Sequence, residues 1–147
     1  MDLEQAIREI VDDPSDPSDF DPRVLGLEFE QMGEVAFDRA MRALREGSVA
    51  ASGLVRGLRT LGLLSRHFAT KRKAEFVSFC CDLMTHRDEA VRSQALLSGV
   101  LGARTSAGIG RPLKDVETEA LRHSIADAIE LGVDPETDAL GRGFLSQ

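Results

Sequence analysis

The sequence predicts an all-α protein, a short right-handed stack of antiparallel helix hairpins. Apolar residues recur at helical spacing along most of the 147 residues, and no segment alternates with the period of a strand over a useful length. Two stretches also share one plan, which is a helix, a short polar turn and a second helix. Their Val-Arg pairs, Val55-Arg56 and Val91-Arg92, lie 36 residues apart, a period typical of stacked helical repeats. A generic helical bundle is the alternative architecture.

The clearest copy of this plan is LMTHRDEAVRSQALLSGVLGA, residues 83–103. Asp88 is well placed to cap its second helix, because the carboxylate can accept from the otherwise unpaired amides of the first turn. The segment resembles a HEAT-type repeat or its armadillo relatives, in which an apolar helix, a turn with Asp and a helix opening with Val-Arg follow one another. The first copy departs from the pattern, with Ser48 in place of Asp. The resemblance, over about residues 36–103, implies a binding scaffold and carries over no catalytic residue.

We expect a single helical domain over residues 1–147. Its parts in order are a helix (1–11), an acidic Pro-rich linker (12–22), two helix hairpins (23–103), a loop (104–113) and a C-terminal helix with a tail (114–147). The tail is expected to hold one more helical turn and then fray. The first and last helices are expected to cap the stack, because uncovered apolar end faces would favour self-association.

Each helix is predicted from its own apolar face. In the N-terminal helix this face consists of Leu3, Ile7, Ile10 and Val11, and in the helix that ends at residue 45 it consists of Phe37, Ala40, Met41 and Leu44. The next helix, about 49–66, is expected to be capped by Ser48, and its Gly53, Gly57 and Gly62 are expected to allow close packing. The helix at about 71–85 is expected to bury Phe76, Phe79, Cys80, Leu83 and Met84. The helix at about 114–132 is expected to turn inward Val116, Ala120, Leu121, Ile125, Ala128 and Ile129.

The two cysteines, Cys80 and Cys81, are adjacent in the sequence. A disulfide between neighbours on a helix would be strained, so a free, reduced pair is expected. Such a pair suits the cytoplasm, where we expect the protein. No apolar run approaches the ~20 residues of a bilayer-spanning helix, and the acidic N-terminus lacks the features of a secretory signal. No membrane association is therefore expected.

The formal net charge of −7 is distributed unevenly. Residues 47–74 contain no acid and six bases, which we call the basic island: Arg56, Arg59, Arg66, Lys71, Arg72 and Lys73. This island is a candidate anion or partner site, or else a helix face paired with the acids of a neighbouring helix. Residues 1–46 carry 13 acids and five bases. The candidate acidic partner surface is formed by Asp12, Asp13, Asp16, Asp19 and Asp21, together with helix 28–46.

No pattern of catalytic or metal-binding residues emerges from the sequence. His67, His86 and His123 are far apart and show no zinc-ligand spacing, and the Asp-rich linker lacks the Gly and Glu of a calcium loop. We therefore expect no enzyme activity, cofactor or metal. The leading hypothesis is a non-catalytic protein-binding scaffold or adaptor, in one version an acidic inhibitor of the immunity-protein type. The alternative is a helical-repeat protein that binds anions or nucleic acid through the basic island, with self-association also open.

Overall fold

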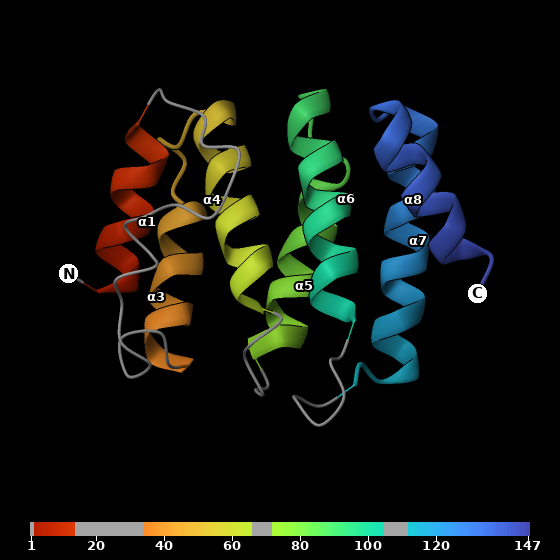
Figure 1. Ribbon diagram of the computed structural model, residues 1–147, viewed down its shortest axis with the longest axis horizontal. Coiled ribbons are helices and arrows are strands. Elements are labelled where there is room, and N and C mark those ends of the chain that lie inside the picture. Colours follow the sequence, from red (N-terminus) through yellow and green to blue (C-terminus); the bar gives the residue numbers. More distant parts are fainter. Residues whose placement is uncertain (1, 14–33, 66–71, 105–111) are drawn as a thin grey trace.

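The computed structural model describes residues 2–13, 34–65, 72–104 and 112–147, and these residues form seven helices (Figure 1). Every regular element in these ranges is helical, so the predicted all-α class is confirmed for them. The helices are α1 (Leu3–Asp12), α3 (Glu34–Leu44), α4 (Ala51–Ser65), α5 (Arg72–Leu83), α6 (Glu89–Ala103), α7 (Asp115–Leu131) and α8 (Pro135–Leu145). None of them is long and apolar enough to cross a membrane.

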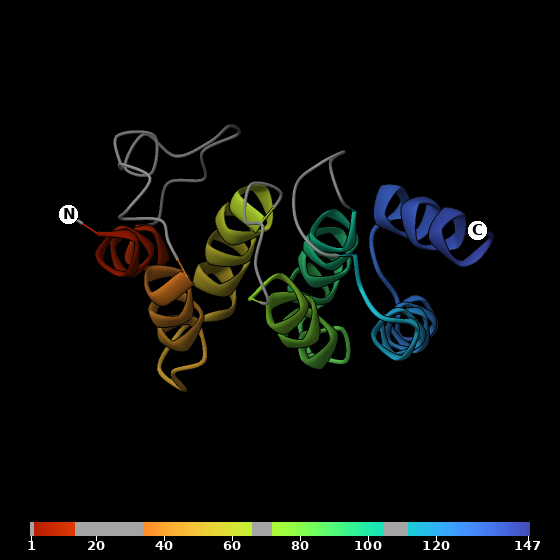
Figure 2. The same ribbon diagram turned by 90° about the horizontal axis from the view of Figure 1, so that it is seen from below.

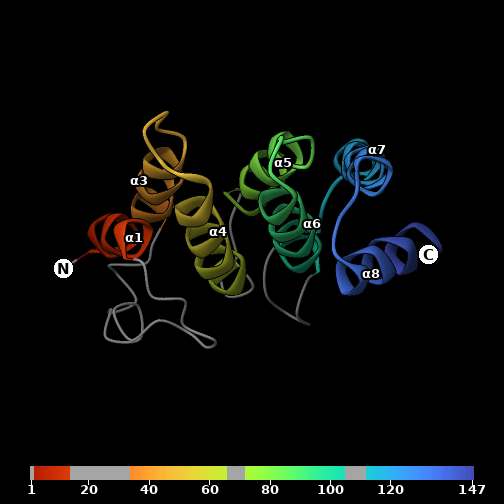
Figure 3. The same cartoon turned by 90° about the horizontal axis from the view of Figure 1, so that it is seen from above.

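The helices are arranged in two layers. Helices α3, α5 and α7 form one layer, and α1, α4, α6 and α8 form the other (Figures 2 and 3). The most extensive packing joins α4 to α6 within a layer and α5 to α6 between the layers. Helix α1 lies at one end of the molecule and α7 with α8 at the other (Figure 1). The two termini therefore lie at opposite ends.

The core follows the predicted apolar faces, except at two positions of α7 that were predicted to face inward: Val116, in the first turn, is 73% exposed, and Ala120 is exposed as well. In α1, Leu3, Ile7 and Ile10 are almost fully buried, as expected from their spacing. Phe37 of α3 and Phe76 of α5 are also fully buried and meet edge to face, with ring centroids 5.7 Å apart. This geometry is favourable for two aromatic rings. It joins successive helices of one layer through residues at similar places in the two predicted hairpins.

Close approaches between helices occur at glycines, as predicted. A Cβ atom on Gly53 of α4 would lie 2.8 Å from the main-chain oxygen of Val11, and one on Gly62 would lie 2.9 Å from Oγ of Ser98. Any larger residue at Gly53 would have to push the end of α1 away, because the obstacle is main chain. The helix-propensity cost of these glycines is therefore offset by tight packing.

Of the two predicted helix N-caps, Asp88 is confirmed and Ser48 is not. Asp88 caps α6 as expected, with its carboxylate accepting from the main-chain N–H of Val91 at 3.2 Å. The expected cap at Ser48 is wrong, because α4 begins at Ala51 and its first turn closes from Leu54 N–H to Ala50 O. Ser48 is exposed in the preceding turn.

The C-terminal tail is more ordered than predicted. Helix α8 has 11 residues, where the sequence led us to expect one turn and fraying. Asp134 caps this helix by accepting from Thr137 N–H at 2.9 Å, and Pro135 follows at the first helical position. Gly141 then allows close packing, since a Cβ atom there would lie 3.1 Å from Ile125 of α7. Tertiary packing thus maintains a helix that the two glycines of the tail would otherwise weaken.

Candidate functional site

Only part of the predicted acidic surface falls within the described residues. Asp12 is the exposed last residue of α1, and Asp13 follows it, with its main-chain N–H donating to Ile10 O at 3.3 Å. Asp16, Asp19 and Asp21 lie outside the described residues. The two described acids stand at the negative end of the α1 dipole, where a cation is needed to offset them.

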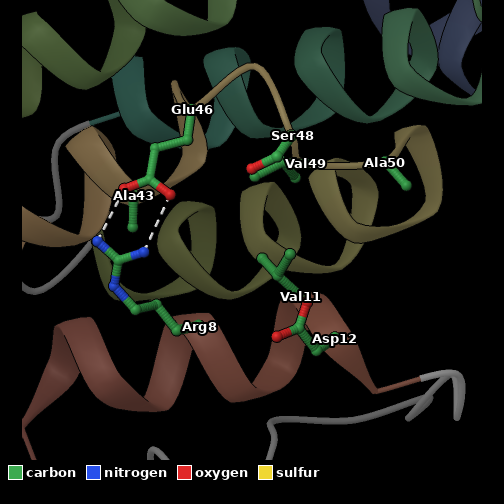
Figure 4. A pocket seen from close by; sticks show the side chains of 8 residues that line it. All are labelled: Arg8, Val11, Asp12, Ala43, Glu46, Ser48, Val49 and Ala50. Carbon is green, nitrogen blue, oxygen red and sulfur yellow. Dashed lines mark hydrogen bonds and ion pairs between the residues drawn. The ribbon is translucent and has the colours of Figure 1, made fainter.

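A cavity of about 250 Å³ lies between α1 and the turn that joins α3 to α4 (Figure 4). Arg8 and Glu46 form a two-bond ion pair at this cavity, with Nη1 donating to Oε2 at 3.0 Å and Nη2 to Oε1 at 2.8 Å. The hydrogen bond from Arg8 lowers the pKa of Glu46, and the bonds to Glu46 and then Glu4 raise the pKa of Arg8. These charges are therefore already paired, and the pair connects α1 to the α3–α4 turn.

The basic island does not form one described surface. Arg56 and Arg59 are its members with described side chains, and both lie on α4. Arg66 and Lys71 lie outside the described residues, and Arg72 and Lys73 are described only as the first two residues of the α5 backbone. The predicted anion site at Arg66 to Lys73 therefore stays a prediction.

Arg56 is engaged inside the fold. Its Nε donates to Ile10 O at 2.9 Å and its Nη2 to Val11 O at 2.6 Å. The last carbonyls of a helix have no partner within that helix, and a cation is favourable beside them. Arg56 thus caps α1 through main-chain carbonyls, and not through the acids of a neighbouring helix as the alternative interpretation had it.

Arg92, the counterpart of Arg56 in the second Val-Arg pair, also bonds to main-chain carbonyls. Its Nε donates to Gly132 O, just after α7, at 2.9 Å, and its Nη1 donates to His86 O in the α5–α6 turn at 2.9 Å. Each arginine therefore binds the C-terminal end of another helix: Arg56 that of α1 at one end of the molecule, and Arg92 that of α7 at the other.

A groove of about 200 Å³ crosses the layer that contains α4, α6 and α8. Its lining combines apolar and polar side chains from three helices and from the turn before α8: Val55, Arg59, Ala90, Ser93, Gln94, Leu97, Asp134 and Thr137. We call it the α4–α6–α8 groove. Only Arg59 among these residues belongs to a predicted site. The structure therefore places one member of the basic island beside residues that the sequence did not single out.

Gln94 lines this groove, and only 8% of the residue is exposed. Its Nε2 donates to Ser98 Oγ at 2.9 Å, and Ser98 Oγ donates in turn to Leu58 O at 3.0 Å. Because the single hydroxyl proton of Ser98 goes to that carbonyl, Ser98 must accept from the amide nitrogen of Gln94. Within the described part of the chain, no donor reaches the amide oxygen of Gln94.

Asp134 supplies a negative charge at the α8 side of the groove. Burial opposes its ionisation, but hydrogen bonds from the main chain and hydroxyl of Thr137 and from Ser93 outweigh burial, so the pKa of Asp134 is lowered. Its main-chain N–H donates to Ser93 Oγ at 3.0 Å, which links α8 to α6. The carboxylate is thus held in place and ionised at neutral pH.

The two cysteines offer no reactive site. Both are free thiols, as predicted from the strain of an adjacent disulfide. Burial raises the pKa of Cys80 and is also the main cause of the raised pKa of Cys81, so both remain protonated near neutral pH. Elsewhere in the described ranges, no group of His, Cys, Asp and Glu is arranged to hold a metal ion.

Sequence reasoning missed Gln94 and Asp134 for a definable reason. Gln94 stands in an otherwise apolar and small-residue helix face, and Asp134 lies in the tail that was expected to fray. A polar residue on the inward side of an apolar helix was the available signal for Gln94. The Asp-Pro-Glu run at 134–136 was the available signal for a capped helix at Asp134.

Comparisons with protein-family models, with curated proteins and with solved structures found no match to this chain.

Proposed function

We propose that this chain is a HEAT-like stack of helix pairs that binds a protein partner and catalyses no reaction. The observation that carries the proposal is the α4–α6–α8 groove, whose lining combines apolar side chains with the polar groups of Gln94 and Asp134. The Val-Arg pairs and the two layers of helices in Figure 3 support the repeat interpretation.

The groove lies on rigid elements, which favours binding. Its walls come from three helices of one layer, in which α6 packs against both α4 and α8, and Ser93 and Asp134 are joined by a hydrogen bond across the α6–α8 junction. A surface that is already ordered loses little conformational entropy when a partner docks. The partner would therefore meet a preformed site.

The charge distribution supports the version in which the partner is basic. Residues 2–13 contain five acids and one base, and residues 112–147 contain eight acids and three bases. These segments form the two ends of the molecule (Figure 1). Acidic flanks speed the approach of a basic protein through long-range attraction. An acidic inhibitor of a basic protein is thus one form of the proposal, and the free thiols fit the reducing cytoplasm.

Affinity capture with matched surface variants tests the proposal. Ala90 lines the groove, whereas Ala126 is exposed on α7 in the other layer, so Ala90→Tyr and Ala126→Tyr add the same neutral bulk at different faces. We expect a partner from the native cell to be retained by the tagged wild-type chain and by Ala126→Tyr, but lost with Ala90→Tyr. Absence of any retained protein at low and at physiological salt would contradict the proposal.

A further inference from the structure

We infer that His86 is a pH switch, in which the neutral imidazole closes the α5–α6 turn and its protonation opens that turn and loosens the connection to the end of α7. His86 lies in the α5–α6 turn and is partly buried. Its Nδ1 accepts a hydrogen bond from the main-chain N–H of Asp88 at 3.0 Å. This device belongs to the fold and does not depend on the proposed partner.

The hydrogen bond to Asp88 requires a neutral imidazole with its proton on Nε2. A neutral ring has one N–H group and one bare nitrogen, and only the bare nitrogen can accept. The reversed ring orientation would turn the C–H group at Cδ2 toward the Asp88 N–H, which would leave that donor without its acceptor. Protonation puts a hydrogen on both ring nitrogens, so the bond cannot persist in the imidazolium. Histidine is the side chain whose charge ordinarily changes between pH 5 and 8.

The charged groups beside His86 come from its own turn and from α6. Arg87 and Arg92 carry positive charge, and Asp88 and Glu89 carry negative charge at the start of α6. The Asp88 carboxylate already caps α6. An imidazolium that turned toward this carboxylate would compete with the cap, and one that turned to solvent would leave the Asp88 N–H without an acceptor. Either rearrangement opens the turn.

Arg92 connects the α5–α6 turn to the end of α7. Its Nη1 donates to the main-chain oxygens of His86 and Arg87 at 2.9 and 3.1 Å, and its Nε donates to Gly132 O at 2.9 Å. The charged group of the α7–α8 turn, Asp134, is engaged at the start of α8. The two carbonyls that hold Nη1 belong to the turn that the His86–Asp88 bond closes. Opening this turn therefore displaces two acceptors of Arg92 and loosens its contact with α7.

A pH titration of the full-length ¹⁵N-labelled protein, from pH 7.5 to pH 5, tests this inference by NMR. The ring ¹⁵N shifts of His86 report which nitrogen carries the proton, and the amide signal of Asp88 reports its hydrogen bond. We expect a bare Nδ1 at pH 7.5. The Asp88 amide and Arg92 Nε–H signals should then move with the same midpoint as the His86 ring. A protonated Nδ1 at pH 7.5, or an Asp88 amide that does not respond, would overturn the inference.

His86→Asn separates the hydrogen bond from the charge. An Asn side chain can accept from the main-chain N–H two residues later, and it does not titrate. At pH 5 the protection of the Asp88 amide against hydrogen exchange should be about tenfold higher in this variant than in the wild type, the effect of one hydrogen bond. At pH 7.5 the two proteins should differ by less than about twofold. Equal protection at pH 5 would contradict the switch.

His123→Asn is the matched control, because it removes an exposed histidine on α7. In this variant the Asp88 amide should respond to pH as in the wild type. The His86→Asn variant also tests the connection to α7, since its Arg92 Nε–H signal should stay at the pH 7.5 position when the pH is lowered to 5. An Arg92 signal that moves equally in His86→Asn and in the wild type would show that His86 does not control this contact.

Discussion

Arg56, Arg92 and Arg122 each donate to main-chain carbonyls at the C-terminal end of another helix. Arg122 of α7 reaches Leu145 O at the end of α8 at 2.6 Å, as Arg56 reaches α1 and Arg92 reaches α7. The last carbonyls of a helix are short of main-chain partners, and a guanidinium group offers them several donors in a fixed fork. At the scale of single residues, positive charge therefore stabilises helix ends inside the fold.

Arg92→Ala should lower the free energy of unfolding by about 2–3 kcal/mol, because several carbonyls lose a charged donor together. Arg87, whose side chain is exposed one turn earlier in the chain, is the matched control. Arg87→Ala should change stability by less than about 0.5 kcal/mol. Urea unfolding followed by circular dichroism measures both, and equal effects would contradict the capping role of Arg92.

Asp134 predicts a pH dependence of stability. Its pKa in the folded protein is below the ordinary value of 3.8, so its extra stabilisation is fully present above that value and is lost as the pH falls through the folded pKa. Asp134→Asn removes this titration and retains a capping oxygen. The difference in unfolding free energy between wild type and variant should therefore be larger at pH 6 than at pH 2.5. A difference that is constant with pH would refute the assignment.

At the scale of helices, features that depend on local sequence could be predicted, whereas features that depend on contacts between helices could not. The apolar faces of α1 and α5 and the cap at Asp88 were predicted from local spacing along the chain. The Asp-Pro-Glu run marks the start of α8, but the 11-residue length of this helix could not be predicted, because it depends on packing between Gly141 and Ile125. The groove could not be predicted either, since Gln94 and Asp134 become neighbours only when α6 and α8 pack together. Spacing along the chain predicts a helix face, whereas contacts between distant helices need the structure.

Gly53→Ala tests the close approach of α4 to α1. The added Cβ atom would meet the main-chain oxygen of Val11, so the free energy of unfolding should fall by about 1–3 kcal/mol despite the better helix propensity of Ala. Gly143→Ala in α8 is the matched control, because nothing lies within 4 Å of its Cβ position. It should leave stability unchanged or raise it by up to about 1 kcal/mol. The melting temperatures of both variants measure these effects. A Gly53→Ala variant more stable than the wild type would contradict the close approach of α4 to α1.

At the scale of the whole molecule, α1 covers one end of the two layers. It packs on both α3 and α4, and Leu3, Ala6, Ile7 and Ile10 are buried there. Without this helix, the apolar surface of α3 and α4 that faces it would be open to solvent. Exposed apolar patches of this kind promote association.

Deleting residues 1–13 should therefore produce oligomers or aggregates, as measured by light scattering after size-exclusion chromatography. Arg8→Ala is the control, because it breaks the exposed ion pair to Glu46 and leaves the apolar contacts in place. That variant should remain in the same state as the wild type. A truncated chain that stays monomeric and equally stable would show that α1 is not a cap.

Photo-crosslinking in the native cell tests the central claim, that the layer containing α4, α6 and α8 binds a protein. A photoreactive phenylalanine replaces Ala90 at the groove or Ala126 on α7. The account predicts a covalent adduct with one partner from position 90 and none from position 126. An adduct only from position 126, or none from either position, would contradict it.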